Sequence, residues 1–178
     1  MNELNNLFDL TGKRALITGS TQGIGNTLAK GLASVGAEII INSSNKEKVE
    51  KAKDQLISEG MKAYGLVFDV TKPDEIEQAI NDFESTTGPI DILVNNAGIQ
   101  IRAPLEDYDH NDFDRLMRTN VNSIFYVSQT VAKHMIKRGE GKIINIASVQ
   151  SALARPSIAP YTASKGAVSN LTKGMTTD

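Results

Sequence analysis

The sequence has no cysteine and no tryptophan among its 178 residues, and aromatic residues make up only 5% of it. Without cysteine, the chain has neither a disulfide framework nor a metal site built from thiolate ligands. A chain of this length also buries enough surface to fold without such crosslinks. The sequence therefore excludes a small secreted protein of the disulfide-rich kind.

Neither sign of charge is in large excess, and long apolar runs are missing. Nineteen Lys and Arg face 21 Asp and Glu, and the signs are intermixed. Proteins whose main partner is nucleic acid usually carry a basic stripe, and a membrane helix needs about 20 apolar residues in a row. The first residues, MNELNNLFDLTGK, also lack the charged start and apolar middle of a signal peptide. We therefore expect a cytoplasmic protein with no nucleic-acid or membrane partner.

Short apolar runs alternate with segments of helical periodicity along the whole chain. The expected strands are residues 14–18, 37–41, 63–68, 90–94 and 142–147. The expected helices are residues 25–35, 46–58, 73–84, 109–137 and a last one from residue 159 onward. This alternation predicts an α/β fold of the Rossmann-like type, a doubly wound parallel sheet with helices on both faces. No linker or repeat interrupts it, so we expect one domain over residues 1–178.

A glycine-rich segment, TGSTQGIG from Thr18 to Gly25, follows the first expected strand and opens a helix. Glycine permits positive φ angles and close backbone approach, and the free N–H groups of a helix start bind a pyrophosphate. A tight turn alone is the alternative, but the strand before it and the helix after it favour a dinucleotide site. The candidate contacts are Gly19, Ser20, Gln22, Gly23, Ile24 and Gly25.

The end of the second expected strand bears on which dinucleotide binds. An acid at this place would grip the ribose hydroxyls of NAD, but the sequence reads Asn42-Ser43-Ser44-Asn45-Lys46. Serine hydroxyls and a lysine suit a 2′-phosphate, so NADP is favoured and NAD stays possible. The alternative is that Ser43 and Ser44 merely cap the next helix.

The third and fourth strands end in Asp69-Val70 and in Asn95-Asn96-Ala97-Gly98. Open α/β sheets bind ligands at the carboxyl ends of their strands, so these residues are candidate cofactor contacts. Turn chemistry alone also accounts for such residues.

A candidate proton-transfer site lies near the end of the chain. Tyr161 and Lys165 are one helical turn apart, on the same face. A phenol has an ordinary pKa of about 10, and a neighbouring cation lowers that pKa. Tyrosine and lysine occur at this spacing by chance in many helices. Ser148, at the end of the fifth strand, adds a hydroxyl that can bind the oxygen of a substrate.

Taken in order, TGSTQGIG, DV from Asp69, NNAG from Asn95, TNVNS from Thr119, Ser148 and YTASK from Tyr161 resemble the motifs of the short-chain dehydrogenase/reductase family. The resemblance covers essentially the whole chain. It implies an NAD(P)-dependent oxidoreductase acting on CH–OH groups, with the catalytic tetrad Asn120, Ser148, Tyr161 and Lys165.

The resemblance also implies a role for each member of the tetrad. Tyr161 would exchange a proton with the substrate oxygen, and Ser148 would polarise that oxygen. Lys165 would lower the Tyr161 pKa and bind the nicotinamide ribose, with Tyr161 and Lys165 thus also contacting the cofactor. Asn120 would hold a water that connects Lys165 to solvent. From its position alone, Asn120 could equally satisfy a local carbonyl group.

Two arginines flank the expected reaction centre. The guanidinium groups of Arg102 and Arg155 suit a carboxylate, although a surface position is the alternative for each. Residues 95–104 and 148–168 resemble the branch of the family that interconverts D-gluconate and 5-keto-D-gluconate. The implied substrate is a small-molecule sugar acid, with contacts from Arg102, Ser148, Gln150, Arg155 and Tyr161. Ala152 departs from that branch, which carries Glu there.

Two other functions stay open at this point. A reductase of 3-oxoacyl groups on an acyl carrier protein would use basic residues such as Lys133, Lys137 and Arg138. The other alternative is a dinucleotide-binding module without turnover, because residues 171–178 read as a helix still in progress. Family members continue with further strands, so we expect the last strands of the usual fold to be lacking and the domain to be incomplete at its C-terminus.

The family pairs its subunits through the fourth and fifth helices, so we expect a homo-oligomer, a dimer or tetramer. No metal site is expected, because His110 and His134 read as surface residues of a helix.

Overall fold

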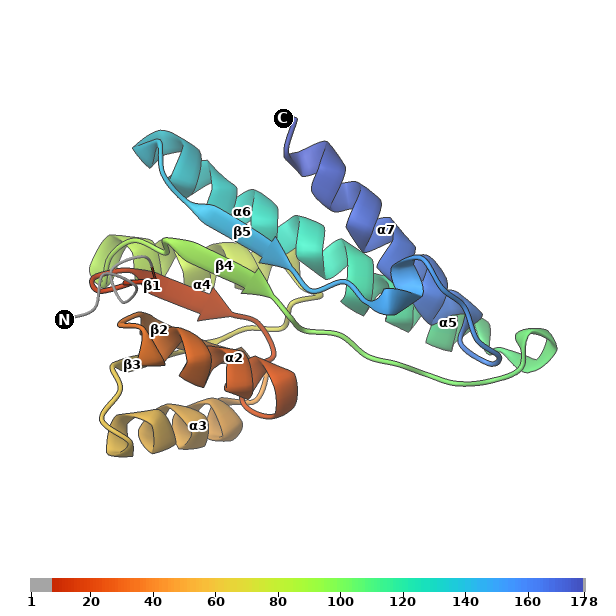
Figure 1. Cartoon of the computed structure of the whole chain (residues 1–178), viewed down its shortest axis with the longest axis horizontal. Helices are drawn as coiled ribbons and strands as arrows, with labels where there is room; N and C mark the ends of the chain where they lie inside the picture. The colour runs from red at the N-terminus through yellow and green to blue at the C-terminus, as the bar shows by residue number, and fades with distance from the viewer. Residues whose placement is uncertain (1–7, 178) are drawn as a thin grey trace.

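A computed structural model describes residues 8–177 and contains a five-stranded sheet in which every pairing is parallel (Figure 1). The order across the sheet is β3-β2-β1-β4-β5. The strands are β1 (Arg14–Ile17), β2 (Glu38–Ser43), β3 (Ala63–Val67), β4 (Ile92–Asn95) and β5 (Lys142–Asn145). All five expected strands are confirmed. Most of the N-terminal segment on which the expectation about a signal peptide rests lies outside the described residues.

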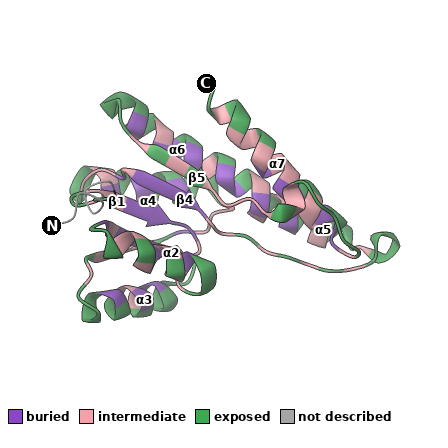
Figure 2. Cartoon of the chain, in the orientation of Figure 1, coloured by how far each residue is buried: buried purple, intermediate pink, exposed green. Residues whose placement is uncertain are grey.

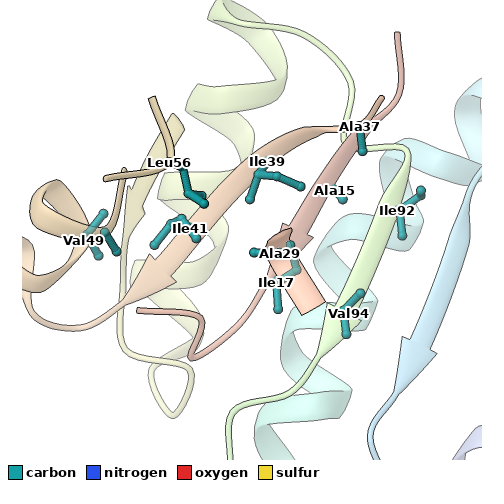
Figure 3. Packing of buried hydrophobic residues seen from close by; sticks show 11 residues of the cluster. Ala15, Ile17, Ala29, Ala37, Ile39, Ile41, Val49, Leu56, Ile92 and Val94 are labelled. Carbon is teal, nitrogen blue, oxygen red and sulfur yellow. The ribbon is translucent and has the colours of Figure 1, made fainter. Parts of the chain in front are cut away.

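Helices cover both faces of the sheet because successive strand residues point to opposite sides. Ala15 and Ile17 of β1 pack under α2 (Gly23–Ser34), and α3 (Lys46–Ser58) covers β2 in the same cluster, as Figure 3 shows. Leu16 faces the other way, toward α4 (Pro73–Thr86) and α6 (Ser123–Arg138). The predicted Rossmann-like, doubly wound α/β fold is therefore confirmed.

The middle of the sheet is the most deeply buried part of the described chain, as the purple strands in Figure 2 show. Leu16, Ile40 and Leu93 have no exposed surface. Burying each such side chain contributes roughly 1.5–3 kcal/mol. The edge strand β5 is less buried. Lys142 and Ile144 are exposed, and they alternate with the partly buried Ile143 and Asn145.

The expected single helix over residues 109–137 is wrong in one respect. It consists of α5 (His110–Met117) and α6, joined without a break by a wide π-helical turn, η2 (Arg118–Asn122). Asp109 caps the start, with its carboxylate accepting the N–H groups of Asn111 and Asp112. Such wide turns are rare and occur often at functional sites, and this one carries the buried Asn120.

The last helix, α7 (Ala159–Met175), begins where the sequence predicts. The expectation that it continues through residues 171–178 is wrong within the described residues, because the helix ends at Met175. The N–H groups of Thr176 and Thr177 close the end by bonding to the carbonyls of Lys173 and Gly174. Two short 3-10 turns, η1 (Leu105–Asp107) and η3 (Val149–Ser151), complete the elements. No helix within residues 8–177 combines the length and apolar character needed to cross a membrane.

At the amino ends of the strands, the Glu38 carboxylate lies in an ion pair with Arg14 and accepts hydrogen bonds from Tyr64 and Lys62. Arg14 Nε lies 2.9 Å away, Tyr64 Oη 3.1 Å and Lys62 Nζ 3.3 Å. Burial by itself raises the pKa of Glu38, but the hydrogen bonds and positive charges outweigh it and hold the pKa below the ordinary 4.5. The ionised form of Glu38 thus joins β1, β2 and β3.

This network makes stability depend on pH. A carboxyl whose folded pKa is depressed stabilises the fold above its unfolded pKa and loses that contribution as the pH falls through its folded pKa. We expect Glu38→Gln to lower the free energy of unfolding at pH 7 by about 1.5–3 kcal/mol. The difference from the unmodified chain should shrink toward about pH 3. Urea unfolding at both pH values measures it, and a difference independent of pH would contradict the role of the charge.

Candidate active site

The carboxyl ends of β1 and β4 are joined by side chains that bond to main chain. Thr18 Oγ1 accepts the N–H groups of Asn96 and Ala97, each at 3.0 Å. The Asn96 amide donates back to the carbonyls of Thr18 at 2.9 Å and Gly19 at 3.2 Å. Asn96 therefore shapes the loop with its side chain and presents main chain to the space above the sheet.

Asn42 joins β2 to β3 in a similar way, through a side chain that bonds to main chain. Its amide nitrogen donates to the carbonyls of Leu66 and Phe68, at 3.1 and 3.2 Å. The hydroxyl of Ser20 donates to Ile17 O at 2.6 Å and accepts Asn42 N–H at 3.0 Å. Ser20 is completely buried, so its hydroxyl is used inside the loop.

Above these strand ends lies a pocket of about 260 Å³. It brings together eight of the predicted cofactor contacts from four separate segments: Gly19, Ser43, Ser44, Asp69, Val70, Asn96, Ala97 and Gly98. The sequence reasoning missed Ile99 and Thr119, which line the same pocket and directly follow and precede recognised motif residues. Gln22, Gly23 and Ile24 lie outside this lining, exposed at the start of α2.

Two glycines of the loop have no room for a side chain. A Cβ on Gly25 would lie 2.6 Å from Asn96 Nδ2 and 2.7 Å from Gly19 O. Gly19 has a φ of +63°, and its Cβ would lie 3.0 Å from the Cα of Ala97. The loop thus needs glycine to bring its main chain close to β4, which leaves the space above free for a ligand.

The alternative role for Ser43 and Ser44, as caps of α3, is wrong. Asn45 caps that helix, because its side chain accepts the N–H of Lys48 at 2.9 Å. Ser43 Oγ accepts the N–H of Asn45 at 3.2 Å, and Ser44 is exposed at the pocket. Asp69 forms a tight turn, with Oδ1 accepting the N–H and hydroxyl of Thr71 at 2.9 and 2.8 Å.

Lys165 lies at the carboxyl end of β5, where its ammonium donates to Ile146 O at 2.7 Å. Only 6% of the residue is exposed, and burial lowers the pKa of Lys165. Its Nζ is 5.8 Å from the centre of the Tyr161 ring. The structure therefore brings the predicted pair together beside the end of β5.

Asn120 connects η2 with both the pocket loop and α7. Its Oδ1 accepts Ile99 N–H at 2.8 Å, and its Nδ2 donates to Ile99 O at 2.9 Å and to Ser164 Oγ at 3.2 Å. Ser164 in turn donates to Tyr161 O at 2.7 Å. The side chain of Asn120 thus satisfies a carbonyl group, as its position in the sequence suggested, but that carbonyl is 21 residues away.

The loop after β5 is held against α7. Ser148 Oγ accepts Gln150 N–H at 3.2 Å and so begins η3. Ser151 Oγ donates to Lys165 O at 2.8 Å, which fixes η3 beside Tyr161 and Lys165. The side-chain oxygen of Gln150 is buried without a hydrogen-bond partner among the described residues. Buried acceptors are usually paired, so this oxygen has room in its hydrogen bonding for a donor such as a water or a bound hydroxyl group.

The two arginines lie on loops that touch. Arg102 and Arg155 are both exposed, and Ala103 N–H donates to Ser157 O at 3.3 Å between the two loops. Ser157 has a φ of +63°, a rare conformation for a residue with a side chain. The residues expected to bind a sugar acid are therefore brought to neighbouring loops.

Residues 8–177 hold no cluster of three or more His, Asp or Glu side chains that could bind a metal ion. His110 is exposed, as expected. His134 is partly buried and lies 2.7 Å from Asn81 Oδ1 through its Nε2.

Comparison with known proteins decides the family. A family model described as short chain dehydrogenase matches residues 13–178. The chain belongs to the short-chain dehydrogenase family. Members of this family are oxidoreductases that act on CH–OH groups with NAD(P), so the predicted family and enzyme class are confirmed.

Several relatives are similar over nearly all of this short-chain dehydrogenase. It is 60% identical over 172 residues to the gluconate 5-dehydrogenase of Gluconobacter oxydans, covering 97% of this chain and 67% of the relative. It is 49% identical over 172 residues to the 5-keto-D-gluconate 5-reductase of Escherichia coli K12, with 97% and 68% covered. The chain thus spans about two thirds of the length of these relatives.

One solved structure is also similar to this short-chain dehydrogenase. It is a gluconate 5-dehydrogenase from Burkholderia cenocepacia J2315 in complex with NADP and tartrate. The TM-score is 0.95 at 56% sequence identity, with 97% of this chain and 68% of that chain covered.

Gly25→Ala tests the loop. The added methyl collides with the Asn96 amide and Gly19 O, so we expect NADPH to bind at least about tenfold more weakly, a loss of about 1.4 kcal/mol. Gly31→Ala is the matched control, because it lies in the same helix with open space around its Cβ. Isothermal titration calorimetry measures both variants. Equal affinity of Gly25→Ala and Gly31→Ala would contradict the close approach.

Proposed function

We propose that this chain is an NADP(H)-dependent oxidoreductase that interconverts a secondary alcohol and a ketone on a sugar acid, D-gluconate and 5-keto-D-gluconate. The observation that carries the proposal is the placement of Lys165 and Tyr161. The ammonium is fixed to the end of β5 and lies beside the phenol. The dinucleotide pocket opens at the same edge of the sheet.

The residues at the pocket fit NADP. Gly19 and Gly25 let the loop pack tightly against the residues after β4, where a Cβ would collide, and a close-packed glycine loop of this kind suits a bound pyrophosphate. Asn42, Ser43 and Ser44 line the side of the pocket at β2, where no carboxylate repels a 2′-phosphate. We propose that Ser43 and Ser44 bind this phosphate, with NAD as the weaker alternative. The NADP in the similar Burkholderia structure supports this choice.

The chain's own residues would handle the proton in this reaction. Bound NADP(H) would supply or accept the hydride at the substrate carbon. Tyr161 would exchange a proton with the substrate oxygen, and the Lys165 ammonium would stabilise the phenolate. Lys165 would also bind the ribose next to the nicotinamide. Ser148 Oγ accepts a main-chain N–H in the described structure, so its own hydroxyl hydrogen would be donated to the substrate oxygen.

The side-chain amide of Asn120 is already used in hydrogen bonds within the protein, which limits what else it can bind. Its side-chain oxygen and nitrogen are engaged by Ile99 and Ser164. The water that we propose to link Lys165 to solvent would therefore be held through the main chain of η2. A wide turn suits this, because its carbonyls depart from the regular helical pairing.

We propose that one set of residues binds the carboxylate of the sugar acid and another binds its hydroxyl groups. Arg102 and Arg155, on the two joined loops, suit the carboxylate of the substrate. The buried oxygen of Gln150 suits a sugar hydroxyl, because a hydroxyl donates where a carboxylate cannot. The tartrate in the Burkholderia structure, itself a hydroxy acid, supports this substrate class.

Residues 1–178 would act as one domain in a cytoplasmic homo-oligomer. Phe113, Phe125 and Ile136 are exposed apolar side chains on α5 and α6, and such surface favours pairing between copies. Arg138, one of the basic residues that an acyl carrier protein would need, already bonds to Glu84 and to Ile90 O. Lys133 lies 3.5 Å from Glu77. These contacts favour the sugar-acid function.

Tyr161→Phe tests the function. Without the phenolic proton, turnover of 5-keto-D-gluconate should fall by at least about 100-fold. NADPH binding, measured by calorimetry, should stay within about twofold of that of the unmodified chain. Turnover is followed by the absorbance of NADPH, and the same assay with a 3-oxoacyl thioester distinguishes the carrier-protein reductase. Equal turnover by Tyr161→Phe and the unmodified chain would overturn the assignment, and binding without turnover by the unmodified chain would favour a binding module.

Ser44→Asp tests the cofactor preference. A carboxylate at this place repels the 2′-phosphate, so kcat/KM for NADPH should fall by at least about tenfold while that for NADH holds or rises. Ser44→Ala removes only a hydrogen bond and should lower kcat/KM for NADPH by less than about tenfold. A loss with Ser44→Asp that is equal for NADPH and NADH would place the 2′-phosphate elsewhere.

A further inference from the structure

A groove of about 620 Å³ separates α6 from α7, with β5 at its base. Its walls include Phe125, Ile136 and Met175, and three polar side chains, Ser128, Asn145 and Thr172, also line it. The two helices diverge from their shared end beside α5 toward the C-terminus (Figure 1). The angle of α7 is thus not set by close packing against α6 along this length, and other contacts must hold it.

Three of the polar residues at the groove, Ser128, Asn145 and Thr172, belong to one chain of hydrogen bonds. Asn95 Nδ2 donates to Ser128 Oγ and to Asn145 Oδ1, each at 2.8 Å. Asn145 Nδ2 donates to Thr172 Oγ1 at 2.9 Å, and Thr172 donates to Val168 O at 2.8 Å. Donors and acceptors match at each step, so the chain runs without a break through α6, β4, β5 and α7.

The same strand end holds the catalytic lysine. Asn145 is followed by Ile146, whose N–H donates to Asn95 O at 3.0 Å and whose carbonyl accepts Lys165 Nζ. Lys165 and Thr172 are two turns apart on one face of α7, about 10.5 Å along its axis. Helix α7 is therefore fixed to neighbouring residues of β5 at two points, with Tyr161 one turn beyond the first.

We propose that Asn145 and Thr172 are positioning residues, which set the angle of α7 and so the place of Tyr161 and Lys165 above the sheet. Neither touches the reacting atoms. The proposal rests on the proposed function for its kinetic consequence. With both contacts, α7 has one orientation on β5. Without the Thr172 contact, Asn145 keeps only its weak 3.9 Å contact with Met175 Sδ at this end of α7, while the remaining bonds lie near Ser164 and Lys165. The helix can then turn about its start and shift the phenol relative to the pocket.

Thr172→Val keeps the shape of the side chain and removes the hydroxyl, whereas Thr172→Ser keeps the hydroxyl. We expect kcat for 5-keto-D-gluconate to fall about 10- to 100-fold in Thr172→Val, since small misplacements of a catalytic group have effects of this size. The Kd for NADPH should change much less than kcat does, because most of the proposed cofactor contacts lie on other strands and only Tyr161 and Lys165 move with α7. Thr172→Ser should restore kcat to within about threefold.

Thr176→Val is the matched control. It removes a hydroxyl from the end of α7, where Thr176 is exposed and donates to Lys173 O within its own helix. It should leave kcat and the NADPH affinity unchanged. All variants are assayed well below their measured unfolding temperatures, so that loss of folded protein does not enter kcat.

Lys165 also gives a readout that needs no turnover. Its pKa is lowered by burial, so the ¹³Cε signal of Lys165, assigned from its loss in Lys165→Met, should titrate below the ordinary lysine range. In Thr172→Val the titration should move back toward that range as water reaches the amine, and Thr172→Ser should behave as the unmodified chain does.

The two readouts separate the two proposals. If the unmodified chain turns over no sugar acid, the proposed function fails, and the Lys165 titration still decides the positioning role. Unchanged titration in Thr172→Val would overturn that role, as would a loss of kcat that Thr172→Ser does not restore or that Thr176→Val reproduces.

Discussion

Parallel strands that end at one edge of a sheet leave main-chain donors and acceptors there, and these groups need partners. In this chain side chains supply them: Thr18 bonds to the start of the loop after β4, Asn96 bonds back to β1, and Asn42 bonds across to β3. These bonds hold four strand ends in fixed relation. The floor of the pocket above them is closed by the protein's own polar groups, and Gly19 and Gly25 let the loop pack closely against the residues after β4.

The second half of the site depends on a buried charge. Removing an ammonium from water costs several kcal/mol unless hydrogen bonds and nearby electron density offset it. Ile146 O and the ring of Tyr161 provide both for Lys165. Ile146 directly follows β5, so the hydrogen bond to its carbonyl ties Lys165 to the end of that strand. Asn120 bonds to Ser164 of α7 and to Ile99, and so connects this helix to the loop beside the dinucleotide pocket.

The fold and much of the site could be predicted because their signals are local. Apolar runs mark the strands, and the four-residue spacing of Tyr161 and Lys165 places them on one helical face. The wide turn η2, the capping role of Asn45 and the hydrogen-bond chain through Asn145 could not be predicted. The turn and the hydrogen-bond chain depend on residues that other elements present, and sequence periodicity does not report contacts between distant segments. The cap is local, but Ser43, Ser44 and Asn45 are all residues that cap helices well, so the sequence does not distinguish them. Asn120 shows this well, since its partners lie 21 and 44 residues away.

In the proposed function, this chain moves a hydride between NADP(H) and the sugar carbon. The most direct measurement supplies NADPH that carries deuterium at the transferred position of C4 together with 5-keto-D-gluconate, and locates the label in the product by mass spectrometry and NMR. We expect gluconate with one deuterium, at C5. Tight binding of NADPH with no deuterium at C5 would contradict it.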